Sequence, residues 1–216
     1  MWCIPKVTPE FLSCMNDVLK QYEKGYHSWY PRVCLDEKSH QLLSTPRGER
    51  TVQRGKPKRI DYEYKRHGTV NLFVTIEPKK GKRTIRVTDQ RTGKDFAKFV
   101  KFLCMKVYRN AKKVHLILDN LNTHNRKTLL EHLGEDQGKQ VAERIVWHYT
   151  PKHASWLDQA EIEIGVLTSQ VLRKRIATKS TLIPEVRAYQ ERRNKEKATI
   201  NWQFTRAMAK KKFKLH

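Results

Sequence analysis

The sequence VCLDE at residues 33–37 decides the fold, together with its counterpart LILDN at residues 116–120. Each is a short apolar run that ends in a carboxylate, Asp36 in the first and Asp119 in the second. Short apolar runs indicate strands buried in a sheet, and functional side chains gather beyond the carboxyl ends of such strands. We therefore predict an α/β fold, a mixed sheet flanked by helices, in which Asp36 and Asp119 converge where their strands end.

A third acidic stretch, WLDQAE at residues 156–161, opens a strongly periodic helical pattern. Glu161 and Glu163 lie on opposite flanks of its apolar face, about 200° apart by the helical period, so only one of them is expected to face a site. Spacing alone does not choose between them, and Asp158 lies on the same side as Glu161. The apolar face itself has the three-four spacing of a core helix: Leu157, Ala160, Ile164, Leu167 and Val171.

These carboxylates indicate a metal site. Two acids at strand ends and a third on a helix can hold a pair of divalent cations for phosphodiester chemistry. A single Asp after a strand more often begins a turn. Two such positions with a helix-borne acid, in a very basic chain, favour the metal site instead.

The charge of the chain indicates its partner. Its 216 residues carry a formal charge of +23, from 45 Lys and Arg against 22 Asp and Glu. A surplus this large favours binding to a polyanion, and nucleic acid is the first expectation. We expect no membrane association, because no apolar run approaches the roughly 18 residues that span a bilayer. The sequence shows neither zinc-ligand spacing nor a glycine-rich nucleotide motif.

Two basic segments are candidates for contact with DNA. A polar excursion at residues 44–67 carries a nearly uniform positive strip: Arg47, Arg50, Arg54, Lys56, Lys58 and Arg59. The loop of Lys152, His153, Ser155 and Trp156 precedes a helix, whose N-terminal N–H groups can bind a phosphate. For Trp156, base stacking and core packing are equally weighted alternatives. His124, His148 and His153 lie near the acidic stretches, where they could contact phosphate or assist proton transfer, but we expect them to be mainly hydrogen-bonded structural residues.

The remaining pattern completes the expected order of elements. We predict strands at 70–76, 84–88, 114–118 and 144–149, and helices at 8–24, 95–108, 125–133, from 156 onward and at 181–198. This order divides the chain into an N-terminal helix with a connector at 1–30, a core at 31–180, and a C-terminal helix with a basic tail at 181–216.

The three acidic stretches also carry a resemblance. HYTPKHASWLDQAE at residues 148–161 closely resembles the last catalytic block of mariner-like DDE transposases, and especially the bacterial insertion-sequence family called six-thirty. LDNLNTH at 118–124 and VCLDE at 33–37 look like its second and first blocks. The resemblance covers essentially the whole chain, and three blocks in this order are specific.

The resemblance implies a ribonuclease-H-like fold and a site. Asp36, Asp119 and Glu161 would be the catalytic residues and the ligands of Mg²⁺ or Mn²⁺, with two ions expected. The implied activity is metal-dependent cleavage at transposon ends and joining of the freed 3′ hydroxyl to target DNA. The partner would be double-stranded DNA in the bacterial cytoplasm, and replacing Glu163 is expected to be mild.

Some alternatives stay open at this point. The family usually has Asn where this chain has Asp158, whose carboxylate could bind metal, perturb it or face solvent. Relatives carry an N-terminal helix-turn-helix part, which we expect to be separate or missing here, and a homodimer is a further expectation. The rival functions are a catalytically inactive, truncated DNA-binding remnant and a ribonuclease-H-type nuclease acting on RNA in hybrids.

Overall fold

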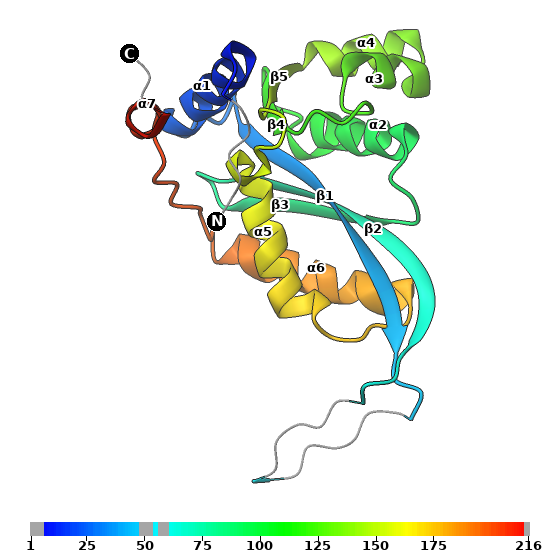
Figure 1. Cartoon of the computed structure of the whole chain (residues 1–216). Helices are drawn as coiled ribbons and strands as arrows, with labels where there is room; N and C mark the ends of the chain where they lie inside the picture. The colour runs from blue at the N-terminus through cyan, green and yellow to red at the C-terminus, as the bar shows by residue number, and fades with distance from the viewer. Residues whose placement is uncertain (1–6, 48–53, 56–60, 214–216) are drawn as a thin grey trace.

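A five-stranded mixed sheet forms the centre of the structure, a computed structural model that describes residues 7–47, 54–55 and 61–213 (Figure 1). Its strand order is β3-β2-β1-β4-β5. β1 pairs antiparallel with β2 and parallel with β4, which confirms the predicted mixed sheet. The strands are β1 (Arg32–Ser44), β2 (Lys65–Glu77), β3 (Lys82–Thr88), β4 (Val114–Leu118) and β5 (Ile145–Tyr149).

Helices cover both faces of this sheet. Figure 1 shows α2, α3 and α4 on one side and α1, α5 and α6 on the other. No helix among the described residues is long and apolar enough to cross a membrane. The helices are α1 (Pro9–Glu23), α2 (Gly93–Phe102), α3 (Arg126–Leu133), α4 (Glu135–Glu143), α5 (Gln159–Leu167), α6 (Lys179–Lys195) and α7 (Arg206–Phe213), with π-helical turns at Leu103–Val107 after α2 and at Thr168–Leu172 after α5.

The alternation of side chains along each strand divides the core into two layers. In β1, Val33 and Leu35 pack with the residues of α2, α3 and α4, whereas Cys34 packs with α1 on the opposite face. Further along the sheet, Leu72 and Val74 of β2 pack with α5 and α6. Both faces of the sheet are therefore buried, which explains why its strands read as continuous apolar runs.

β1 is longer than the sequence predicts, and Asp36 lies within it rather than at its end. β1 continues to Ser44 because it pairs with β2 along almost its whole length. Its pairing with β4 stops at Cys34. Asp36 therefore follows the end of the parallel part of the sheet, while its backbone stays in an antiparallel ladder. The expectation of two strand ends was wrong for this residue.

Two helices were missed in the sequence. α4 follows α3 directly, because Gly134 ends one helix and begins the next at φ +82°. The predicted basic tail contains α7. Phe213 of α7 packs edge-on against Phe11 of α1, with the ring centroids 6.0 Å apart. Both helices are short and mostly polar, so their periodicity is weak. They are held by tertiary packing rather than by intrinsic propensity.

The basic strip of the polar excursion is only partly described. Arg54 forms an exposed turn with Gly55. Lys56, Lys58 and Arg59 lie outside the described residues. Their contact with DNA stays a prediction.

Replacing Gly81 by Ala tests the turn between β2 and β3. Gly81 has a φ of +68°, and an added Cβ would lie 2.5 Å from the carbonyl carbon of Lys197. The left-handed backbone alone costs an L-residue about 1–2 kcal/mol, and the clash adds to it. We expect the free energy of unfolding, measured in urea, to fall by at least this amount. Gly25→Ala is the control, because its Cβ would meet nothing within 4 Å; an equal loss in both variants would contradict this explanation.

Candidate active site

Asp36 and Asp119 are brought together by the parallel pairing of β1 and β4. Cys34 pairs with Ile117, and the same register carried two residues further sets Asp36 beside Asp119. Asp36 Oδ1 accepts a hydrogen bond from the Glu37 backbone N–H at 2.7 Å. Asp119 Oδ1 accepts one from the Leu121 N–H at 3.2 Å. A nearby backbone N–H thus fixes one oxygen of each carboxylate.

Glu161 approaches the same place from α5. It is exposed in the first turn of that helix, and it lines an open cleft of about 530 Å³ together with Asp36. The other lining residues come from β1 and from the helical segment around α5: Glu37, Lys38, Ile164, Gly165, Thr168, Ser169 and Arg173. The cleft thus brings Asp36 of β1 and Glu161 of α5 to one accessible surface, and Asp119 lies beside Asp36 in the register of the sheet.

The acids repel one another. Burial raises the pKa of Asp36 to about 6, and the negative charges of Asp119, Glu161 and Glu37 add to this rise. A carboxyl group whose neighbours are carboxylates is stabilised by a cation between them. Such a site favours the binding of a positive ion.

His124 was placed near the acidic stretches by the sequence, with a mainly structural role expected, and the structure shows its partners. Its Nδ1 lies 2.6 Å from Asp119 Oδ1, and its Nε2 lies 3.1 Å from Glu37 Oε1. Burial alone would lower the pKa of His124, but the hydrogen bonds and charges of Asp119 and Glu37 raise it to about 9. The ring also stacks on Phe96 with centroids 4.5 Å apart. A protonated His124 therefore holds Asp119 in place.

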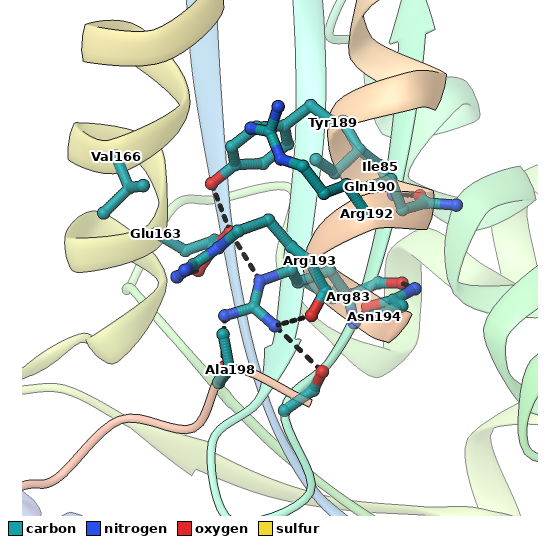
Figure 2. Close-up of polar contacts among 12 residues, drawn as sticks. Arg83, Ile85, Glu163, Val166, Tyr189, Gln190, Arg192, Arg193, Asn194 and Ala198 are labelled. Atoms are coloured by element: carbon teal, nitrogen blue, oxygen red, sulfur yellow. Dashed lines mark hydrogen bonds and ion pairs between the residues drawn. The ribbon is translucent and has the colours of Figure 1, made fainter. Parts of the chain in front are cut away.

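Glu163 has a different environment from Glu161, and Figure 2 shows it. Its carboxylate is 1% exposed and lies 2.6 Å from Nε of Arg83, which is equally buried. Tyr189 donates its hydroxyl hydrogen to the same carboxylate at 2.5 Å, and Arg193 of α6 lies 3.6 Å away. Glu163 thus joins α5 to β3 and α6. We therefore expect its replacement to destabilise the fold, while the mild effect on activity expected from the sequence stays a prediction.

Asp158 neither faces solvent nor joins the cleft. It caps α5, where its Oδ1 accepts a hydrogen bond from the Ala160 N–H at 2.8 Å, and it is 2% exposed. Burial, with the nearby charge of Asp36, raises its pKa well above the usual range. The environment therefore favours the neutral carboxyl, which caps the helix with a shape close to that of Asn.

The donor set fits a hard divalent cation. Carboxylate oxygens are the ligands that Mg²⁺ and Mn²⁺ prefer. Within the part of the chain that the structure describes, no group of three or more His, Cys, Asp or Glu is already drawn together at metal-binding distances. Asp36, Asp119 and Glu161 are near enough to shift the pKa of Asp36, so a cation could bring them together.

The loop before α5 is only partly free for a ligand. Lys152, His153 and Ser155 are exposed, and His153 adopts a left-handed backbone with a φ of 60°. Trp156 is half-buried and packs edge-on against Phe204 at 5.5 Å. Core packing thus accounts for Trp156, whereas DNA contact by the other three stays a prediction.

Comparison with known families identifies the chain. The sequence profile described as DDE superfamily endonuclease matches residues 31–183. The chain belongs to the DDE superfamily endonuclease family. A search of the curated proteins gives no match. The matched range contains Asp36, Asp119 and Glu161, and the predicted relationship to DDE proteins is confirmed at this level.

Solved structures with the same fold include complexes of the Mos1 mariner transposase. The Mos1 mariner paired-end complex with Mn is 14% identical, with a TM-score of 0.59 over 92% of this chain and 60% of that one. A pre-cleavage Mos1 transpososome is 12% identical, with a TM-score of 0.54 over 94% of this chain and 69% of that one. The chain thus spans about 60% of the first match. The likeness confirms the predicted ribonuclease-H-like fold.

The variant Glu163→Gln tests the buried cluster. Removing one partner leaves Arg83 buried with an uncompensated charge, which typically costs about 3–5 kcal/mol. We expect a lower midpoint of urea unfolding, with an unchanged dependence of the unfolding free energy on urea concentration. Glu191→Gln is the control, because its pair with Arg187 is exposed on α6 and such pairs contribute about 0–1 kcal/mol. A loss no larger than in the control would contradict the structural role of Glu163.

The variant Asp158→Asn tests the protonated cap. The folded-state pKa of Asp158 lies above its unfolded value, so its stabilising effect is complete at low pH and is lost as pH rises through the folded pKa. Asn has no such titration. We therefore expect the stability of Asp158→Asn relative to the parent to rise as pH rises and to fall as pH falls, in urea unfolding with chelator. Asp136→Asn, an exposed site, is the control; a gain independent of pH would refute the assignment.

Proposed function

We propose that this chain is the catalytic part of a DNA transposase, and that it cleaves DNA strands at transposon ends and transfers them to target DNA. The observation that carries the proposal is that Asp36 and Glu161 line one open cleft, with Asp119 beside Asp36 on the neighbouring strand. The chain carries a formal charge of +23, which favours binding to a polyanion. The carboxylates form an acidic site within this basic protein.

The three acids are proposed to hold two Mg²⁺ or Mn²⁺ ions. When bound, such a pair of ions activates the attacking oxygen and stabilises the leaving oxygen of a phosphodiester. Asp36 and Asp119 supply ligands from neighbouring strands, and Glu161 supplies one from α5. His124 keeps Asp119 oriented through its hydrogen bond. No covalent link between protein and DNA is needed in this arrangement.

Double-stranded DNA is the proposed partner. The similar structures include Mos1 complexes with a left transposon end, with Mn and with Mg. By analogy we propose a homodimer and a separate or missing N-terminal helix-turn-helix part. Membership of the bacterial six-thirty family, and the division at residues 1–30, 31–180 and 181–216, are likewise proposals.

The amide variants Asp36→Asn, Asp119→Asn and Glu161→Gln test the site one residue at a time. Each removes one charged ligand, so we expect metal-dependent nicking of labelled double-stranded DNA to fall at least a hundredfold. DNA affinity and the urea midpoint should stay near those of the parent. Glu185→Gln, on the exposed surface of α6, is the matched control and should nick normally.

The outcomes separate the rival functions. Full nicking in one amide variant would remove that residue from the site. If the parent protein binds DNA tightly but never nicks it with Mg²⁺ or Mn²⁺, the chain is a DNA-binding remnant. If it cuts only the RNA strand of an RNA–DNA hybrid, it is a ribonuclease-H-type nuclease.

A further inference from the structure

The cleft extends beyond the three acids along the helical segment that carries Glu161. The π-helical turn at Thr168–Leu172 follows α5 directly, so residues 159–172 form one continuous helical segment. Glu161, Gly165 and Ser169 succeed one another at intervals of four residues, and all three line the cleft. Residues four apart lie on one helix face. A stripe thus leads from the third acid to Arg173, which lines the same cleft.

Gly165 has no structural reason to be glycine. Its backbone is not left-handed, and an added Cβ would meet nothing within 4 Å. Glycine within a helix costs about 1 kcal/mol relative to Ala. Packing among the residues that the structure describes does not explain that cost. The use left for a glycine at an exposed position in a cleft is the close approach of a ligand to the helix backbone.

The charges along the cleft change sign. Its acidic end holds Asp36, Glu37 and Glu161, whereas Lys38 and Arg173 line it further on. Lys38 is two residues after Asp36 in β1, so strand alternation sets both on one face. Ser169 Oγ donates to the Val166 carbonyl at 2.8 Å, so the two cations supply the main attraction for an anion.

We propose that Gly165, Lys38 and Arg173 form a track for the sugar–phosphate backbone of one DNA strand, next to the phosphate that is cut at the acids. This inference rests on the proposed function. Glu161 and Arg173 are twelve positions apart, or roughly 18 Å along the helix. Along the axis of a duplex, where each strand carries one charge per 3.4 Å, this length corresponds to about five phosphates. Lys38 and Arg173 bind phosphates without reading sequence, and Gly165 lets the strand lie on the helix.

Arg173→Ala against Lys174→Ala tests the charge of the track. The two residues are adjacent and exposed, but Lys174 faces away, towards Glu185 of α6 at 3.6 Å. Affinity for a short labelled duplex is measured by anisotropy over a range of salt. Loss of one phosphate contact should lower the slope of log affinity against log salt by about one in Arg173→Ala alone. Equal slopes in the two variants would overturn the track.

Gly165→Ala and Gly165→Leu test the space on the helix without changing any charge. Ala should raise the urea midpoint, because it favours the helix and its Cβ meets open space. Both variants should nevertheless bind the duplex several-fold more weakly, Leu more than Ala. A merely structural glycine would not give greater stability with weaker binding. Binding equal to that of the parent in Gly165→Leu would overturn the proposal.

The track and the proposed function fail in different ways. If the parent nicks DNA with Mg²⁺ or Mn²⁺ while the Arg173 and Gly165 variants bind and nick as it does, the track is wrong and the function stands. If the parent never nicks but these variants lose affinity relative to Lys174→Ala, the track is right and the function is wrong. If duplex binding is unaffected but the Gly165→Leu variant changes oligomeric state, the cleft takes protein, and the track is wrong.

Discussion

The short parallel pairing between β1 and β4 is the constraint on which the candidate site depends. Only three residues of β1 pair with β4, and the ladder stops at Cys34. Beyond that point β1 leaves the parallel half of the sheet with β2 alone. The register sets Asp36 beside Asp119, and the end of the ladder opens space in front of them. A shift of one residue in the register of β1 would place the Asp36 side chain on the opposite face of the sheet.

The rotation of α5 is the second constraint. Glu161 and Glu163 are two residues apart, so a helix can present only one of them to the cleft. The buried contacts of Glu163 with Arg83 and Tyr189 hold that face of α5 against β3 and α6. Glu161 is thereby left exposed at the cleft. A buried ion pair adds little net stability, but it specifies one orientation, because any other leaves two charges buried and unpaired.

The site is acidic, whereas the chain as a whole is strongly basic. The protein carries a large positive surplus, yet four carboxyl groups lie close together around the start of α5. The structure limits their repulsion in two ways. Burial favours the protonated form of Asp158, and the charge of His124 balances Asp119 and Glu37. The acids left at the cleft, Asp36 and Glu161, face a region where a cation and a phosphate can meet.

The sequence by itself predicted a mixed sheet, the order of the strands along the chain and the acidic stretches. Apolar runs and the carboxylates that follow them are local signals. The sequence also predicted the periodic helix that carries Glu161. It missed α4 and α7, whose few apolar residues give no clear period, and it set Asp36 at a strand end because pairing with β2 is not local. The residue pattern left Glu161 and Glu163 open and the resemblance favoured Glu161, but only the tertiary structure shows that Glu163 is buried, since its partners lie 80 and 26 residues away in the chain. The same holds for the buried state of Asp158 and for His124, because burial and charge depend on neighbours that the fold alone brings together.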